Sequence, residues 1–465
     1  MNRKELLSFL LIAVIFVLVE ARGLFVISPG DENVYFYMAK SVSEGQIPYR
    51  DFFYAHPPLH VLVLASVIKI FGVSFIALKS ATLLAVIAAS FFLFKISLEL
   101  MKNKFNDENS IAVSSIAIIL FLFSFEVLFK ATFSLGVELA IMLVMISFYL
   151  ILKKRFFLAG LFGGLAGLAR LYSLVPIFVI FTFILIQKIQ QKDKKDFLYM
   201  SLGFFLTFIL AVGLLALLFG NKFIDPVFRY HLLKLKLPGQ RFQVYKNVFL
   251  ENWVILVAFL SSIFMKSKKR FMLLYLIIFF SILFLFSLNV PAEFYFILAF
   301  PFMAIIGAYS IASIIRNINI KFVRYAVIFL VCGVFLWNTA ADIMFLEKFA
   351  FLKFQPLNEM LNDVASGNTN YMFGDDGTVS MLALLTSRKI ALNFIDSNEM
   401  RFTSGLTNFY LFREQLDDIH ISFIIFREGR GLHQIKQFRD YAESRCMPEK
   451  EYTDIVEGNF LLYKC

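Results

Sequence analysis

The sequence predicts a polytopic α-helical membrane protein that ends in a small α/β domain. Three observations carry this prediction. Of the 465 residues, 59% are hydrophobic, and the mean hydropathy is +0.75. Charged residues make up only 17%, whereas soluble domains hold about 25%. The apolar residues gather in long stretches over the first 343 positions, and the last 122 are mixed in polarity. This composition excludes a soluble globular protein and a disordered chain.

The apolar stretches predict eleven membrane crossings, because a bilayer core takes about 20 apolar residues per helix. The expected crossings are residues 6–28, 74–101, 110–128, 132–152, 156–170, 172–188, 196–219, 247–265, 270–289, 292–315 and 321–343. A further apolar stretch, 57–71, is short and follows His56-Pro57-Pro58. We expect it to lie at the outer interface or to re-enter rather than to cross.

Positive charge predicts the orientation of these crossings. Six clusters hold 18 basic residues, at 3–4, 102–104, 153–155, 188–195, 266–270 and 316–324. If all six are cytoplasmic, eleven crossings alternate consistently and the N-terminus is cytoplasmic. The loops on the outer side are then 29–56, 129–133, 220–246 and 289–291, together with everything after residue 343. Glu20 and Arg22 interrupt the first helix and no small-residue cleavage site follows, so we expect an uncleaved helix.

Net charge is distributed unevenly along the chain. The total is +11, but residues 344–465 hold 13 Lys and Arg against 17 Asp and Glu. The basic excess therefore belongs to the membrane loops, where lipid head groups and orientation account for it better than nucleic acid does. The abundance of Phe, Ile and Lys and the absence of an Asn-x-Ser/Thr sequence favour the plasma membrane of a prokaryote.

The C-terminal region, 344–465, has the pattern of an α/β domain outside the membrane. We expect strands at 370–373, 389–394, 420–426 and 459–463, helices at 379–386 and 434–444, and a turn at 374–377. That turn lacks the dinucleotide-binding fingerprint. The chain has no CxxC motif and no Cys/His cluster, so zinc and iron–sulfur sites have no support. Cys446 and Cys465 could pair in an oxidising compartment.

The first outer loop carries the densest set of chemically useful residues. Asp31 and Glu32 follow the first helix directly. Paired carboxylates can take a proton or hold a divalent cation. The same pair could cap the helix that Tyr35–Ser43 predicts, and the local sequence favours this capping role.

The wider pattern of this loop resembles a known family. An acidic pair is followed by Tyr35, then by G-x-x-P-Y-R-D-F at 45–52 and H-P-P-L at 56–59. This ordered set resembles the integral-membrane glycosyltransferases of the GT-C type. It is most similar to the superfamily of dolichyl-phosphate-mannose–protein mannosyltransferases and aminoarabinose transferases. The resemblance covers about 1–343 and implies a GT-C-like membrane domain there, whereas the orientation derived above places the domain at 344–465 outside. It also implies juxtamembrane helices in the first outer loop, as expected for 57–71.

The resemblance assigns candidate catalytic residues. The first-loop acid of the family is a catalytic base or a metal-interacting group, a position that falls on Asp31 with Glu32 beside it. The family's second carboxylate has its nearest match in Glu138, with Glu126 as the alternative. The implied cofactor is a divalent cation, Mg²⁺ or Mn²⁺, held by the first-loop pair. It is not required, because Arg and Lys can neutralise a monophosphate.

Arg170 is the first candidate ligand for a donor phosphate. It ends a segment rich in small residues, 159–170, and resembles the basic residue that ends the corresponding family helix. Its guanidinium can hold a phosphate with two hydrogen bonds. Small residues at this spacing also allow two helices to pack closely. Both interpretations fit the sequence.

Further candidates lie in and around the outer loops. Segment 220–246 breaks the positive-inside pattern with six basic residues: Lys222, Arg229, Lys234, Lys236, Arg241 and Lys246. It is either a solvated loop or an anion site, and we select Arg229, His231 and Arg241 as phosphate ligands, together with His56 from the first loop. For contacts to the substrate the family motifs indicate Tyr35, Arg50, Asp51 and Tyr295. An aromatic residue such as Tyr295 is equally expected at a membrane interface.

The function that this pattern predicts is glycosyl transfer at the outer face of a membrane. The donor would be a sugar carried on a polyprenyl phosphate of the dolichyl or undecaprenyl type. The acceptor would be a protein, a glycan or a lipid. Two other classes stay open: a transporter or flippase of a lipid-linked sugar, which would predict inverted repeats, and a non-catalytic membrane subunit. For the domain at 344–465 acceptor recognition is one hypothesis.

Overall fold

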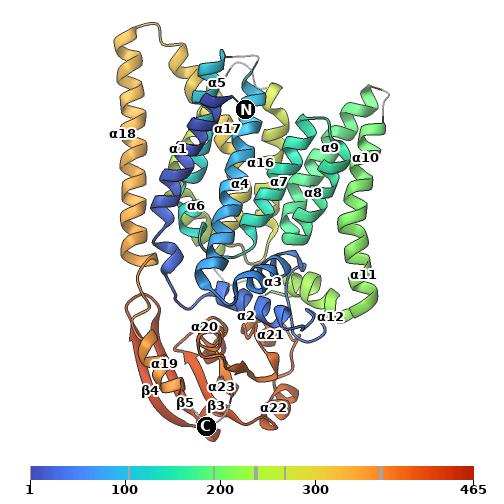
Figure 1. Cartoon of the computed structure of the whole chain (residues 1–465), viewed down its shortest axis with the longest axis vertical. Helices are drawn as coiled ribbons and strands as arrows, with labels where there is room; N and C mark the ends of the chain where they lie inside the picture. Colours follow the sequence, from blue (N-terminus) through green and yellow to red (C-terminus); the bar gives the residue numbers. More distant parts are fainter. Residues whose placement is uncertain (1, 103–104, 192–193, 235–238, 266–268, 366–369) are drawn as a thin grey trace. The chain divides into compact units, whose positions relative to one another are not determined.

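The computed structural model describes residues 2–102, 105–191, 194–234, 239–265, 269–365 and 370–465 (Figure 1). Five basic residues of the predicted cytoplasmic clusters and of the 220–246 segment lie outside the described residues: Lys104, Lys192, Lys236, Lys266 and Lys268. The chain divides into two compact units. Unit 1 comprises residues 1–23, 80–213 and 237–350, and unit 2 comprises residues 24–79, 214–236 and 351–465. Unit 2 therefore adds the first outer loop and part of the 220–246 segment to the C-terminal region.

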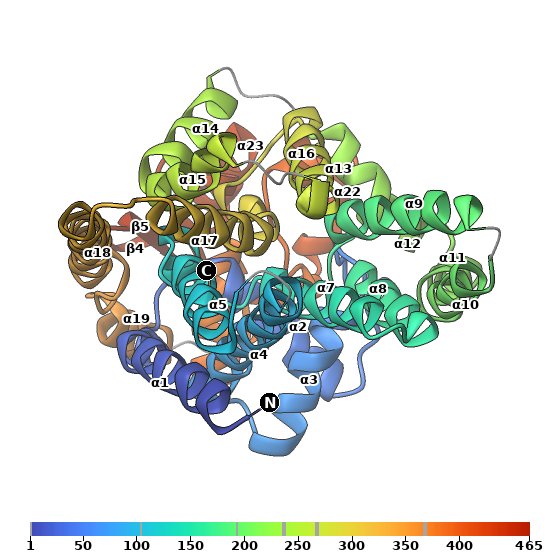
Figure 2. The same ribbon diagram turned by 90° about the horizontal axis from the view of Figure 1, so that it is seen from above.

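Unit 1 is helical, and its helices run side by side with α18 at the rim (Figure 2). Its helices are α1 (Arg3–Glu20), most of α4 (Phe75–Met101), α5 (Asp107–Leu122), α6 (Phe125–Lys130), α7 (Val137–Leu152), α8 (Phe156–Ala169), α9 (Leu174–Gln190), α10 (Lys195–Phe204), part of α11 (Leu210–Phe219), α14 (Gln240–Glu251), α15 (Trp253–Leu260), α16 (Met272–Ser287), α17 (Phe300–Arg316) and α18 (Lys321–Phe345). A 3₁₀ segment, η7 (Glu293–Leu298), precedes α17.

The small residues of α8 let it pack closely on α10. A Cβ atom on Gly160 would lie 1.9 Å from the backbone oxygen of Met200, and one on Gly203 would lie 2.2 Å from that of Phe157. Neither position can hold a larger residue unless the two backbones move apart. The packing interpretation of the small residues in 159–170 is therefore confirmed.

Four helices are long and apolar enough to cross a bilayer among the described residues: Phe75–Met101, Leu171–Gln190, Lys195–Phe219 and Lys321–Ala350. A fifth candidate is a broken pair, Arg241–Glu251 and Trp253–Phe264, bent by 78°. The stretch 247–265, expected to cross, is therefore not one continuous helix, because the chain turns at Asn252. The number of crossings stays a prediction.

Two other apolar stretches, 110–128 and 57–71, can be compared with the expected crossings. The stretch 110–128 breaks into α5 and α6 at Ser124. Helix α3 (Leu59–Phe71) has 13 residues, which rise about 20 Å against the ~30 Å of a bilayer core. Its length therefore fits the prediction that this stretch does not cross.

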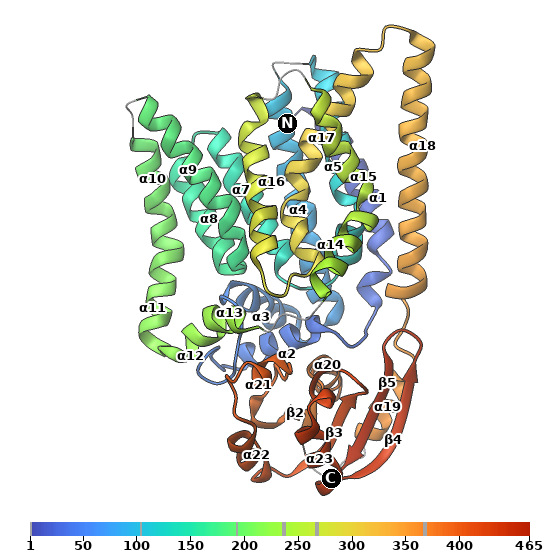
Figure 3. The same ribbon diagram turned by 180° about the vertical axis from the view of Figure 1, so that it is seen from behind.

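Unit 2 contains a five-stranded mixed sheet (Figure 3). Its strands are β1 (Tyr371–Gly374), β2 (Lys389–Ile390), β3 (Ile421–Arg427), β4 (Met447–Asp454) and β5 (Gly458–Lys464), in the spatial order β2-β1-β3-β5-β4. Strand β1 runs parallel to β2 and β3, whereas β5 is antiparallel to β3 and β4. Its helices are α2 (Asp31–Ser43), α3, α12 (Asn221–Ile224), α13 (Tyr230–Leu233), α19 (Leu357–Ala365), α20 (Asp376–Thr386), α21 (Met400–Thr403), α22 (Phe409–Asp417) and α23 (Lys436–Arg445).

Most elements expected for the C-terminal region are confirmed, with β1, α20, β3, α23 and β5 near their predicted positions. The strand expected at 389–394 is wrong beyond its first two residues. Leu392 and Asn393 have φ values of 56° and 50°, which no strand accommodates. Strand β4 was not predicted, because it is a mostly exposed edge strand with few apolar residues.

A disulfide joins Cys446 to Cys465. It links the residue before β4 to the residue after β5, which closes the antiparallel β4–β5 pair at one end. The pairing that the sequence left open is therefore present. Cys332 on α18 is exposed and has no disulfide partner among the described residues.

Replacing both Cys446 and Cys465 by Ser should destabilise unit 2. A disulfide that closes a loop of about 20 residues contributes about 3 kcal/mol, mainly by restricting the unfolded chain. Thermal unfolding of the full chain in detergent should show a lower midpoint, and protease should cut near β4 and β5 sooner. Cys332→Ser is the matched control and should leave both readouts unchanged. A double variant that melts like the wild type would contradict the prediction.

Candidate functional site

Helix α2 places the first-loop acids at its start. It begins at Asp31, four residues before the predicted start, and its N-cap is Gly30, which makes no side-chain cap. The expectation that Asp31 or Glu32 is the N-cap of this helix is therefore wrong. Both acids occupy the first turn, where the helix dipole stabilises negative charge.

The two acids have different surroundings. Glu32 is 1% exposed, and its Oε1 lies 2.9 Å from Nζ of Lys79, which is fully buried near the start of α4. Asp31 is exposed. Glu32 therefore fixes α2 to the first turns of α4 through a buried ion pair. Asp31 is the acid of the pair that can meet a substrate.

Three predicted residues lie together beside this helix. The hydroxyl of Tyr35 is 3.1 Å from Nε2 of His56, and the His56 ring stacks on His231 at 5.3 Å between centroids. Nε2 of His231 lies 2.7 Å from the backbone oxygen of Ala55. Because a carbonyl oxygen only accepts, Nε2 of His231 carries a proton and donates it. The structure thus brings Tyr35, His56 and His231 into one polar cluster.

Other predicted residues of unit 2 are engaged with their own neighbours. Arg50 donates from Nε and Nη2 to the carboxylate of Asp51 at 2.8 and 2.9 Å. These hydrogen bonds, with one from the Ile47 amide, lower the pKa of Asp51. Arg229 is exposed and lies 3.8 Å from Asp225. None of these residues joins the Tyr35–His56–His231 cluster through a contact that the structure describes.

The C-terminal region adds acids that the sequence analysis treated only as a turn. Asp375 caps α20 by accepting from the amide of Thr378 at 3.1 Å and from its hydroxyl at 2.6 Å. Burial, reinforced by the charges of Asp375, Asp396 and Asp31, raises the pKa of Asp376 well above its usual range. Asp376 therefore lies close enough to Asp31 for the two carboxyl groups to interact.

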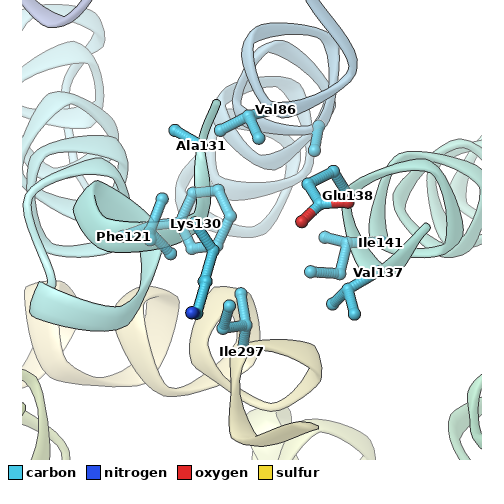
Figure 4. A pocket seen from close by; sticks show the side chains of 10 residues that line it. Val86, Phe121, Lys130, Ala131, Val137, Glu138, Ile141 and Ile297 are labelled. Atoms are coloured by element: carbon cyan, nitrogen blue, oxygen red, sulfur yellow. The ribbon is translucent and has the colours of Figure 1, made fainter. Parts of the chain in front are cut away.

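In unit 1, Glu138 and Lys130 line one small pocket from opposite sides (Figure 4). Glu138 stands in the first turn of α7, after the left-handed Gly136, and is 4% exposed. Lys130 is the last residue of α6. The pocket has room for little more than a water molecule and is otherwise apolar. A carboxylate and an ammonium group thus share a low-dielectric space in which their charges act strongly.

Arg170 belongs to the same surroundings. It follows α8 in an extended conformation and is 3% exposed. The positive charges of Arg170 and Lys130 both act on the carboxylate of Glu138. Tyr295 in η7 packs against Tyr172, with ring centroids 4.9 Å apart. The structure thus brings the predicted Glu138 and Arg170 together and adds Lys130 to them.

Arg241 and Glu126 have other roles in unit 1. Arg241 donates to the backbone oxygens of Leu288 and Asn289 and so holds the chain after α16. It belongs to unit 1, whereas His231 and Arg229 belong to unit 2. Glu126 is 1% exposed, and its amide donates to Oδ1 of Asn252 at 3.1 Å. Glu126 stands at the bend between α14 and α15.

The sequence analysis missed Lys130 and Asp376. Lys130 could have been found, because it is the one basic residue of the predicted outer loop 129–133 and so runs against the positive-inside pattern. Asp376 could not, since its relation to Asp31 depends on tertiary packing.

The first-loop pair as a whole does not fit a divalent cation, because the carboxylate of Glu32 is already paired with the ammonium group of Lys79. Among the described residues no group of three or more His, Cys, Asp or Glu has the geometry of a metal site.

The fold defined by these units is that of the GT-C glycosyltransferases. ArnT from Cupriavidus metallidurans in the apo state has a TM-score of 0.64 at 11% identity, covering 97% of both chains. ArnT bound to undecaprenyl phosphate has a TM-score of 0.66 at 10% identity, covering 99% of this chain and 98% of that one. The archaeal oligosaccharyltransferase AglB from Archaeoglobus fulgidus, in complex with an inhibitory peptide and a dolichol-phosphate, has a TM-score of 0.57 at 12% identity. The match covers 91% of this chain and 69% of AglB.

No family model and no curated protein sequence matches the chain. The structural likeness confirms the GT-C fold that the first-loop motifs predicted. The apolar helices and the fold together make the chain an integral membrane protein.

Replacing Glu32 by Gln should destabilise the protein strongly. The substitution removes the charge that Lys79 faces in a buried setting, and breaking a buried pair in this way costs about 3–5 kcal/mol. Thermal unfolding in detergent measures the effect. Glu44→Gln is the matched control, because Glu44 pairs with Lys40 at the exposed end of the same helix and should contribute under about 1 kcal/mol. Equal melting of both variants would show that the Glu32–Lys79 pair does not hold α2.

Proposed function

We propose that the chain transfers a sugar from a polyprenyl phosphate to an acceptor at the outer face of the membrane. The observation that carries this proposal is the difference between the first-loop acids: Glu32 is buried against Lys79, and Asp31 is exposed at the N-terminus of α2. The fold supports it, since similar structures were solved with undecaprenyl phosphate and with dolichol-phosphate. A lipid-linked donor also suits a chain whose candidate residues lie next to apolar helices.

In the proposed reaction, Asp31 is the general base. Its carboxylate takes the proton from an acceptor hydroxyl, and the hydroxyl oxygen attacks the anomeric carbon of the donor sugar. The bond between that carbon and the phosphate oxygen breaks, and the phosphate leaves with the lipid and the electron pair. General-base catalysis of this kind contributes about 10²–10⁴-fold to a rate.

Arg170 and Lys130 are assigned to the leaving phosphate. Phosphate gains negative charge as the glycosidic bond breaks, and fixed positive groups in a water-poor site stabilise that charge most effectively. The guanidinium of Arg170 presents two parallel donors that match phosphate oxygens. Glu138 lies among these cations and is proposed to position them, rather than to act as a second base.

The proposed orientation places the N-terminus in the cytoplasm and residues 344–465 outside. The disulfide Cys446–Cys465 supports it, since such bonds persist in oxidising compartments. The charge distribution over the first 343 residues supports it independently.

Replacing Asp31 by Asn should abolish transfer while leaving the protein folded. Membranes carrying the wild type or the variant are supplied with a panel of radiolabelled polyprenyl-phosphate sugars, and label reaching any acceptor is counted. The expected loss is about 100-fold or more. Asp418→Asn, at an exposed position of unit 2, is the matched control and should transfer normally. Equal transfer by the Asp31 variant would move the base elsewhere, and no transfer by folded wild type with any donor would favour the transporter or accessory class.

Replacing Arg170 by Lys should weaken the use of the donor. Lysine keeps the charge but loses the two parallel donors, and a lost hydrogen bond to a charged group costs about 1.5–3 kcal/mol. Steady-state transfer should therefore show kcat/KM for the donor reduced about tenfold or more. Arg155→Lys, at the exposed start of the same helix α8, is the control. An unchanged kcat/KM in the Arg170 variant would remove Arg170 from the donor site.

A further inference from the structure

Unit 2 is assembled from three segments that are far apart in the sequence. Residues 24–79, 214–236 and 351–465 form one compact body. Residues 351–465 therefore share one compact body with the first loop. The C-terminal region packs directly on the loop that carries Asp31, and the side chain of Arg401 and the start of α2 are two of the places where these segments meet.

The first place is the side chain of Arg401 in α21. Its Cζ lies 4.1 Å from the ring centroid of Phe53 in the first loop and 3.9 Å from that of Phe394. The guanidinium is thus stacked between two aromatic faces, a favourable arrangement for a cation. Nη1 donates to the backbone oxygen of Asp396 at 2.6 Å, and the side chain is only 8% exposed. Burial lowers its pKa to about 10, so Arg401 stays charged at neutral pH.

Phe53 is also held from the 214–236 segment. Tyr230 packs edge-on against it, with ring centroids 5.6 Å apart, and is itself 3% exposed. His231, the next residue, bonds to the backbone oxygen of Ala55, two residues after Phe53. All three segments of unit 2 therefore meet around the side chain of Phe53. Arg401 is the residue of the C-terminal region that contacts Phe53.

The second place is the start of α2. A Cβ atom on Gly377 would lie 2.8 Å from the backbone nitrogen of Gly30, the residue before Asp31. Nδ2 of Asn33 donates to the backbone oxygens of Ser28 and Gly377, at 2.8 and 3.4 Å. One turn further along α2, the hydroxyl of Tyr37 accepts from the amide of Ile390 at 3.2 Å. The first turn of α20 therefore fixes the turn of α2 in which Asp31 stands, and strand β2 fixes the next turn.

We propose that the C-terminal region positions the catalytic base, and that Arg401 is the positioning residue through which it holds the first loop. This inference rests on the proposed function, in which Asp31 is the base. Arg401 acts through Phe53 and does not touch the substrate. The C-terminal region then sets the turnover of the enzyme, whereas a region that recognises the acceptor would set the KM for the acceptor.

The test compares Arg401→Met with wild type in the full-length protein. Methionine is close in length and apolar, so it fills the space but loses the charge and the planar stack. We expect kcat to fall about 100-fold, the size of effect that a small misplacement of a reacting group produces, with the KM values for donor and acceptor within twofold of wild type. Hydrogen exchange of peptides covering 28–40 and 50–56 should become faster. Arg401→Lys should recover part of kcat.

Two further variants keep the test decisive. Phe53→Leu removes the aromatic partner from the first loop and leaves the C-terminal region intact, so it should reproduce the loss of kcat if the Arg401 variant does not fold. Arg413→Met is the matched control, because Arg413 is half-exposed on α22 and pairs with Asp417. It should behave as wild type in both readouts.

The proposal is overturned if Arg401→Met raises the KM for the acceptor at unchanged kcat, or if kcat and exchange both stay as in wild type. If wild type transfers no sugar from any donor, the proposed function fails, and the exchange of residues 28–40 alone decides whether the C-terminal region holds α2. Faster exchange in the Arg401 variant would then still support the positioning role, and unchanged exchange would end it.

Discussion

The buried ion pair between Glu32 and Lys79 is the constraint on which the first loop depends. Two charges that are both removed from water are tolerated only when they stay together. Separating α2 from the start of α4 would therefore strongly destabilise the folded protein. This constraint gives two adjacent acids two different roles. Glu32 is occupied in holding the helix, and Asp31, one residue earlier, keeps its exposed place at the positive end of the helix dipole.

The parts of this arrangement that rest on local sequence could be predicted. The acidic pair, the histidines and the apolar stretches appear in the sequence itself, and ordered motifs over 45–59 indicated the GT-C fold. The parts that rest on distant partners could not. The burial of Glu32 depends on Lys79, and the stacking of Phe53 depends on Arg401, so neither pattern is visible in any window of the sequence. The strand expected at 389–394 failed for a local reason, because Leu392 and Asn393 adopt left-handed backbone angles.

Each unit holds its own set of candidate residues. Unit 2 holds an exposed acid together with hydrogen-bonded Tyr35, His56 and His231. Unit 1 holds two cations, Lys130 and Arg170, near the buried carboxylate of Glu138. The two sets differ in character: the first is a partly exposed polar cluster on a short helix and its loop, and the second is enclosed among apolar helices.

The interleaving of three segments in unit 2 also bears on how the protein is made. Residues 24–79 leave the ribosome early, whereas Phe394, Arg401 and the β4–β5 pair are synthesised after the long apolar helix α18. The first loop therefore lacks its contacts with residues 351–465 while most of the chain is synthesised. Domains usually fold as units during synthesis, but this one cannot be completed until residues beyond 401 have emerged. A chain interrupted before residue 377 would carry Asp31 in a first loop that lacks Gly377, Ile390 and Arg401, so unit 2 is complete only when translation is nearly finished.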